Sequence, residues 1–322
     1  MFNERNFIPR LGQGDFPDII HYASPNDADF RKAADLWNAR MPEQYQDLLF
    51  ATVVGDRDHL FSIDERGDWR WLQRSFRYRN PKTREVISDA KWVDLRDDFT
   101  DALYPDMNSI SEGLVSRDIT VHEWLRRMAR LIQQAHLGAW LFGSGGYNTI
   151  DSSSIVTLGQ TLREQYDYLY SFADEIVRQN RVSRQDEIFD IPLSIPLIQL
   201  PTPRPRPQPL PADESRPRGP ITERGLYNRS IMYIESMTQS AERARVTTYE
   251  FHPDILPAYP GDGSTICLAR CRCHWQFIFP RSAQGSYYHA YWRLRGHHPD
   301  GRNCATCLQY TRQWNPYTVE RF

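Results

Sequence analysis

The sequence predicts a mainly α-helical protein of the α+β class, in which a helical core is followed by a small, irregular, β-containing C-terminal module. Three observations predict it: helical periodicity through the middle of the chain, a proline-rich stretch after it, and five cysteines that all lie near the C-terminus. The 322 residues are 40% hydrophobic and 25% charged, a globular composition with room for two or three domains.

The net charge of −2 predicts no long-range attraction to nucleic acid or to an anionic membrane. The first residues, MFNERNFIPRLGQGDF, contain neither a basic n-region nor an apolar h-region, and no apolar run approaches the roughly 20 residues that span a bilayer. We therefore expect a soluble protein that is made in the cytoplasm and has no membrane partner. Disulfides are uncommon in that reducing compartment.

A mixed region is expected over residues 1–90. The stretch PNDADFRKAADLWNARM has helical spacing of its apolar residues and offers Asn26 or Asp27 as an N-terminal cap. The following stretch, up to about residue 80, combines β-rich pieces with turn dipeptides such as those at 64–67. These patterns predict a helix followed by a small hairpin.

The helical core is expected over residues 91–190. Apolar residues recur mostly at three- and four-residue steps through WVDLRDDFTDALYPDMNSISEGLVS, where Pro105 is expected to bend the helix. The next helix begins with Thr120 and Glu123, which have capping-box spacing, and is expected to end at Gly143.

A third helix carries an apolar stripe from Leu158 to Ile176, which requires another helix packed against it. Prolines then stand at nearly every second position of residues 191–220, so this segment is expected to be a polyproline II linker or a docked arm. Residues 221–249 predict a fourth helix that returns to the core, with Pro220 in its first turn.

The last region, residues 250–322, contains every cysteine of the chain, three before a β-like aromatic stretch and two after it in a C-x-x-C knuckle: Cys267, Cys271, Cys273, Cys304 and Cys307. Structural zinc takes four thiolate or imidazole ligands in a tetrahedron, and a C-x-x-C turn presents two sulfurs to one ion. Metal binding supplies folding free energy to a module with few apolar residues. The spacing therefore predicts a structural Zn²⁺ ion that staples the module.

The spacing leaves the exact ligands open, because five sulfurs exceed one tetrahedral site. Cys304 and Cys307 are the first choice, with Cys273 and then Cys271 or Cys267 as the other pair. In an extended C-R-C segment the two cysteines point to the same face. The reserve ligands are His274, His297 and His298. The alternatives are free buried cysteines, or two disulfides in an oxidising environment.

The other motifs favour structural roles. FGSGGYN, which begins at Phe142, follows a helix rather than a strand and lacks the phosphate-loop lysine, so it predicts a helix end rather than a nucleotide site. His122 and His136 lie on predicted helices without cysteine or carboxylate partners at ligand spacing. No catalytic triad or dyad can be argued from spacing, and an all-sulfur metal site leaves no open position for catalysis. We therefore expect no enzymatic activity.

The order of these pieces resembles that of one family. The segments SEGLVSRDITVHEWLRRMARLIQQAHLGAWLFGSGGYNTI, LREQYDYLYSFADEI, SAERARVTTYE and PAYPGDGSTICLARCRCHW are similar to tailed-phage head morphogenesis proteins of the Mu-F-like kind, which are minor capsid proteins. RYRNPKTREVIS is also similar, so the resemblance covers roughly residues 75 to 322. In many relatives a C-x-x-C pair precedes the C-R-C segment, whereas here Cys304 and Cys307 follow it.

The resemblance implies a non-enzymatic structural protein of the virion, located in the head or neck and present in multiple copies. Its implied partners are the portal protein, the major capsid protein or both, and its implied role is to assist head assembly or DNA delivery. The alternative is a zinc-dependent DNA-binding protein that contacts the packaged genome through nearby arginines. These are Arg270, Arg272, Arg281, Arg293, Arg295 and Arg302.

Overall fold

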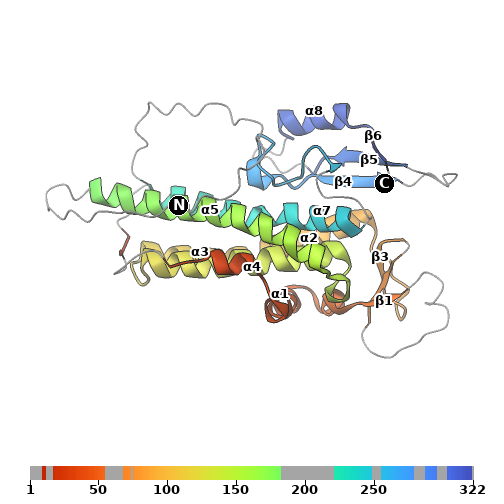
Figure 1. Cartoon of the computed structure of the whole chain (residues 1–322), viewed down its shortest axis with the longest axis horizontal. Helices are drawn as coiled ribbons and strands as arrows, with labels where there is room; N and C mark the ends of the chain where they lie inside the picture. Colours follow the sequence, from red (N-terminus) through yellow and green to blue (C-terminus); the bar gives the residue numbers. More distant parts are fainter. Residues whose placement is uncertain are drawn as a thin grey trace.

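The computed structural model describes residues 9–11, 17–54, 68–73, 75–182, 221–248, 255–278, 287–295 and 303–320. The proline-rich segment, the turn expected at 64–67, and His297 and His298 lie outside these ranges. Helices dominate the described residues and two three-stranded sheets accompany them, which confirms the mainly α, α+β class. Figure 1 shows long helices lying side by side, with the second sheet and the last helix stacked on one side of them.

The first long helix, α1 (Asp27–Arg40), begins where the sequence predicts. Asn26 accepts hydrogen bonds from the first-turn amides, and its own N–H donates to the Asp29 carboxylate, which completes a capping box. Trp37 on the buried face of α1 stacks on Phe142, with ring centroids 4.8 Å apart. The amphipathic pattern therefore places this helix against the body of the protein.

The expected hairpin corresponds to β2 (Arg70–Leu72) and β3 (Arg77–Arg79), which pair antiparallel. A third strand, β1 (Thr52–Val54), joins β2 in parallel, which the sequence did not indicate. A parallel pair needs a crossover connection, so no tight-turn signal marks it. Trp71 of β2 packs edge-on against Tyr78 of β3 and links this sheet to the helices.

The helix expected to bend at Pro105 is two helices, α2 (Asp89–Ala102) and α3 (Tyr104–Val115), separated at Leu103. Pro105 lies in the first turn of α3, where its missing N–H costs no helical hydrogen bond.

The fourth predicted helix is likewise divided, into α6 (Glu223–Glu235) and α7 (Met237–Thr248). Thr222 is the N-cap of α6, because its side chain accepts a hydrogen bond from the Gly225 N–H. The expectation of Pro220 in the first turn is therefore wrong, since the helix begins three residues later.

At the centre lies α4 (Val121–Ser144), which packs against α1, against α5 (Ser152–Val182) and most extensively against α7. The expected helix end at Gly143 is wrong, because α4 continues to Ser144 and Gly145 ends it with a φ of 103°. Gly143 has a different role: a Cβ there would overlap the carbonyl oxygen of Ala241 in α7. Its missing side chain permits the close approach of α4 and α7 at this point.

The described residues from 255 onward form a C-terminal unit with its own hydrophobic cluster, separate from the main core. Its elements are β4 (His274–Ile278), β5 (Tyr287–Arg293), α8 (Ala305–Gln313) and β6 (Tyr317–Glu320), with the strands antiparallel in the order β4-β5-β6. Trp275, Trp292 and Trp314 pack together, with ring centroids 5.3 to 5.7 Å apart. Among the described helices, none combines the length and the hydropathy that a bilayer crossing requires.

Candidate metal centre

Three pieces of the C-terminal unit bring the cysteines together. Cys267 precedes the short 3-10 helix η7 (Leu268–Arg270), and an extended C-R-C segment follows that helix and leads into β4. The third piece is the start of α8, where Cys304 is the N-cap and Cys307 lies in the first turn. All but Cys267, which is half-buried, are buried.

The five sulfurs form two triads that share one member. The sulfurs of Cys271, Cys273 and Cys307 lie within 4.8 Å of one another, and so do those of Cys267, Cys304 and Cys307. The Sγ atoms of Cys271 and Cys307 are 3.5 Å apart. A tetrahedral zinc ion with Zn–S bonds of about 2.3 Å holds its sulfurs about 3.8 Å apart. The donor set therefore fits a thiolate-bound metal ion.

The knuckle at the start of α8 suits negatively charged sulfur. The Cys307 N–H donates to the Sγ of Cys304 at 3.3 Å. Both residues also lie at the positive end of the helix dipole, which favours the thiolate over the thiol. Backbone amides directed at metal-bound thiolates offset their charge, so the local fold of the knuckle is already arranged for ligation.

The thiols also interact strongly with one another. Hydrogen bonds from Cys271 and Cys307 lower the pKa of Cys273 to about 4. Contacts with the Cys267, Cys271 and Cys273 sulfurs raise the pKa of Cys307 well above its usual value. Five clustered thiols, four of them buried, cannot all lose their protons together, because adjacent thiolates repel one another at low dielectric. A metal cation that replaces the protons removes this conflict.

The reserve ligand His274 does not join either triad. It follows Cys273 in an extended segment, so its side chain leaves the opposite face of the strand. Burial and the nearby guanidinium groups of Arg96, Arg245 and Arg295 lower its pKa to about 3. The described part of the centre therefore consists of sulfur alone.

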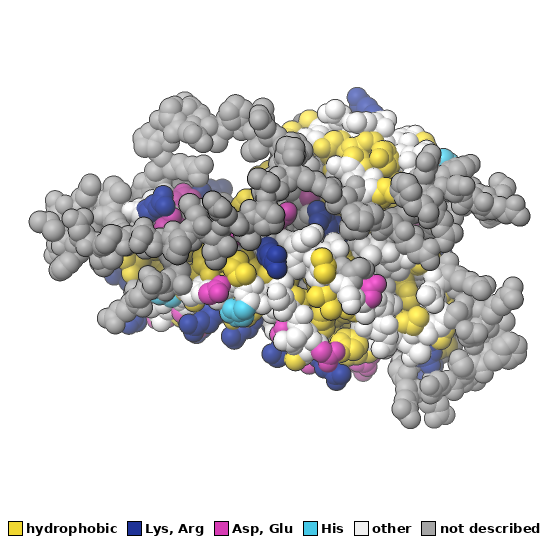
Figure 2. All heavy atoms as spheres, viewed as in Figure 1, with side chains coloured by type: hydrophobic (Ala, Val, Ile, Leu, Met, Phe, Trp, Pro, Cys, Tyr) yellow, Lys and Arg dark blue, Asp and Glu magenta, His cyan; other side chains and the backbone are white. Residues whose placement is uncertain are grey.

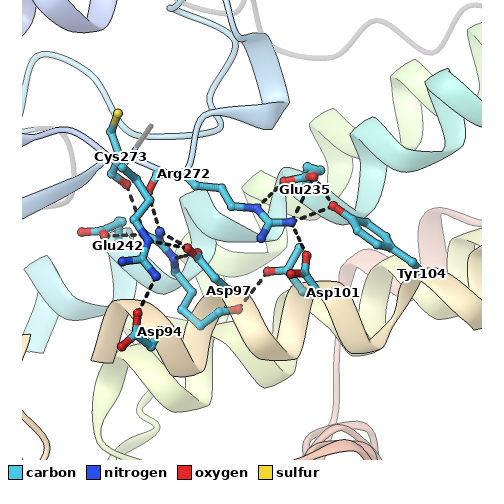
Figure 3. A network of polar contacts seen from close by, with 11 residues as sticks. Asp94, Asp97, Asp101, Tyr104, Glu235, Glu242, Arg272 and Cys273 are labelled. Carbon is cyan, nitrogen blue, oxygen red and sulfur yellow. Dashed lines mark hydrogen bonds and ion pairs between the residues drawn. The ribbon is translucent and has the colours of Figure 1, made fainter. Parts of the chain in front are cut away.

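Arg272, between the two cysteines of the C-R-C segment, points away from the sulfurs and into the helical body. Its Nε donates to Glu235 of α6 at 3.0 Å, and its Nη2 donates to Asp101 of α2 at 2.5 Å and to the Tyr104 hydroxyl of α3 at 2.7 Å. Tyr104 in turn donates to Glu235. The Arg272 side chain is only 3% exposed, and Figure 3 shows these partners converging on it.

Arg96 of α2, whose side chain is fully buried, holds the backbone of the same segment. Arg96 donates from Nη2 to the carbonyl oxygen of Arg272 at 2.6 Å and from Nη1 to that of Cys273 at 3.2 Å. Asp97 and Glu242 accept its other hydrogen bonds and balance its charge. Helices of the body thus position two sulfurs of the metal centre through the peptide groups beside them.

Sequence reasoning considered the arginines of the C-terminal unit only as DNA contacts in the alternative function, and it missed this docking network. Arg295 pairs with Asp94 and Asp97, and Arg293 donates to Gln276. On the face drawn in Figure 2, basic and acidic side chains are interspersed along the helical body. The C-R-C alternation was the available signal, since two cysteines on one face place the arginine between them on the other.

Outside the centre, the described surface has an open hollow on α8, lined by Ala305, Leu308, Gln309, Arg312 and Gln313. It offers no carboxylate, imidazole, thiol or hydroxyl group for catalysis.

Comparisons of the chain with models of known families, with curated proteins and with solved structures found no match.

Proposed function

We propose that this protein is a non-enzymatic structural component of a tailed-phage virion, a minor capsid or head morphogenesis protein with a zinc-stapled C-terminal unit. The observation that carries the proposal is the convergence of all five thiols, four of them buried, in one cluster. Clustered thiolate donors favour zinc among the common divalent ions, and all-thiolate zinc sites are typically structural. Zn²⁺ is therefore the cofactor that we assign to the centre.

The docking of the C-terminal unit supports a role in assembly. Arg96 and Arg272 join this unit to three helices of the body through buried, charge-assisted hydrogen bonds. Such a network fixes the orientation of one surface relative to the other. A protein that holds several partners in place needs this rigidity, whereas a catalyst needs a cleft with reactive groups.

The resemblance to Mu-F-like proteins supports the location and the partners that we propose. It rests on the order of the helical segments and on the PGDG-x-T-x-C and C-R-C elements around Cys267 and Cys273. On this basis the partners are the portal protein, the major capsid protein or both. The protein is made in the host cytoplasm and is incorporated into the head or neck in multiple copies.

The DNA-binding alternative receives less support from the contacts of its arginines. Arg272, Arg293 and Arg295 have partners within the chain, and Arg281 and Arg302 lie outside the described residues. A genome-binding role predicts an affinity for duplex DNA that falls steeply with salt. Binding of that kind by the purified chain would favour the alternative.

The test of the proposal is the location of the chain in particles. Particles from a host that carries the gene are purified on a gradient, and the chain is quantified by mass spectrometry relative to the major capsid protein. We expect a fixed copy number well below that of the capsid protein, and density at the portal vertex or inner shell by electron cryomicroscopy. Absence of the chain from particles, despite its normal production in the cell, would overturn the proposal.

A further inference from the structure

Cys307 has a special place among the sulfurs. It is the shared member of the two triads: its Sγ lies 3.5 Å from that of Cys271 and within 4.8 Å of those of the other three cysteines. In a single tetrahedral site no sulfur has this role, because all sulfur–sulfur separations are equal, at about 3.8 Å. One sulfur close to two separate pairs is instead the arrangement of a thiolate that bridges two metal ions.

We propose that the centre binds two zinc ions, with Cys307 as the bridging ligand. The inner ion is held by Cys271, Cys273 and Cys307, and the outer ion by Cys267, Cys304 and Cys307. This inference rests on the zinc centre of the proposed function and specifies its stoichiometry and its ligands. It also gives every cysteine of the chain a ligand role.

The charge balance favours two ions over one. One Zn²⁺ with four thiolates and a neutral fifth thiol has a net charge of −2, whereas two ions with five thiolates have a net charge of −1. The guanidinium groups of Arg96 and Arg272 do not compensate this charge, because they donate to carboxylates, a hydroxyl and backbone carbonyls on the other side of the segment. A large uncompensated charge among buried cysteines is costly.

The two positions differ in exposure. The inner triad is entirely buried, whereas the outer triad includes the half-buried Cys267. Three thiolates leave one coordination position on each ion, which a solvent oxygen fills on the outer ion. Among the described residues no carboxylate or imidazole joins either triad, so a bound water has no adjacent general base. The outer ion is therefore structural and is the first to be removed by a chelator.

Metal content of the purified full-length chain provides the first test. Zinc is measured by elemental analysis and native mass spectrometry at saturation, and we expect two ions per chain. Cys267→Ser and Cys271→Ser should each retain one ion, and Ser264→Ala, a nearby change that removes no sulfur, should retain two. Saturation at one ion per wild-type chain, or an unchanged zinc content in Cys267→Ser, would overturn the proposal.

Wild-type chain gives a second readout that does not depend on the folding of variants. Cobalt(II) is titrated into metal-free chain, and the paramagnetic resonance signal should rise with the first equivalent and fall with the second, because a thiolate bridge couples the two spins. In the zinc form, all five thiols should resist alkylation. A signal that keeps rising, or rapid alkylation of Cys267 in the saturated zinc form, would contradict a bridged pair. These outcomes are independent of whether the chain is found in particles.

Discussion

Arg96 of α2 donates a 2.6 Å hydrogen bond to the backbone carbonyl oxygen of Arg272, the residue between two cysteines of the candidate metal centre. The same peptide is therefore shared by the metal site and by the contact with the helical body. Metal binding orders this segment, and the ordered segment docks more readily on the helical body. By linkage, docking favours metal binding to the same extent. The helical body and the metal centre are thus expected to stabilise each other.

Replacing Arg272 tests this coupling without removing a sulfur. Arg272→Met leaves Glu235, 7% exposed at its side chain, without its cation, which we expect to lower the free energy of unfolding by about 3–5 kcal/mol. Zinc affinity should fall about tenfold or more, because the support of the ligand segment is lost. Urea unfolding and zinc competition with a chromophoric chelator measure the two effects. Arg270→Met, two residues away, is the matched control, because among the described residues Arg270 makes a long contact of 3.4 Å to Asn228 and pairs with no carboxylate.

Metal removal is expected to loosen the C-terminal unit before the helical body. The two have separate hydrophobic clusters, and the smaller one includes four of the cysteines. On adding a strong chelator, amide hydrogen exchange should rise sharply in β4, β5 and α8 and change little in α4. Mass spectrometry of exchanged peptides measures this. Unchanged exchange in β4 and α8 after complete metal loss would show that the unit does not depend on its metal.

Gly143 is expected to be intolerant of even one methyl group. Gly143→Ala places a Cβ against the backbone of Ala241, and neither helix can move without disturbing the core, so we expect a loss of about 2 kcal/mol or more. Gly113→Ala is the control, because its Cβ would lie 3.4 Å from Ile119 and alanine favours helix. Denaturant unfolding should show loss of stability in the first variant only.

Stability is expected to fall in mild acid because of His136. This residue is fully buried between Ser240 and Ser236, with ring nitrogens 2.7 and 3.1 Å from their hydroxyl oxygens, and burial lowers its pKa to about 3. The folded protein keeps the ring neutral, whereas the unfolded chain takes up a proton below about pH 6.5. The contribution of the neutral His136 ring to stability is therefore fully present above pH 6.5 and is lost progressively down to pH 3. At pH 5 the free energy of unfolding should be about 2 kcal/mol lower than at neutral pH.

Urea unfolding measured at several pH values tests whether the free energy of unfolding falls as the pH is lowered. His136→Gln, which retains hydrogen-bonding groups, should flatten the decrease between pH 7 and pH 5, although His274 contributes in the same direction. His21→Gln, which replaces a histidine at an exposed position, is the matched control variant. A stability that rises as the pH falls from 7 to 5 would contradict a neutral buried imidazole.

Helix positions were predictable because their signals are local. The cap at Asn26, the cap at Thr120 and the apolar stripe of α5 each depend on residues within a few turns of one another. The misassigned role of Gly143 has a tertiary cause. A glycine permits both a helix end and a close helix contact, and only the position of Ala241 in α7 decides between them.

By itself, the sequence determined that the chain is mainly helical, that its cysteines belong to one small C-terminal region, and that Cys271 and Cys273 share a face. Only the tertiary structure decided that the sulfurs form two triads joined at Cys307, and that Arg272 and Arg96 anchor the segment on three helices. The physical reason is the sequence separation between interacting residues, because helical periodicity and helix caps depend on residues that are close together in the chain. A metal centre and a buried ion pair depend on atoms that are brought together from segments more than thirty residues apart.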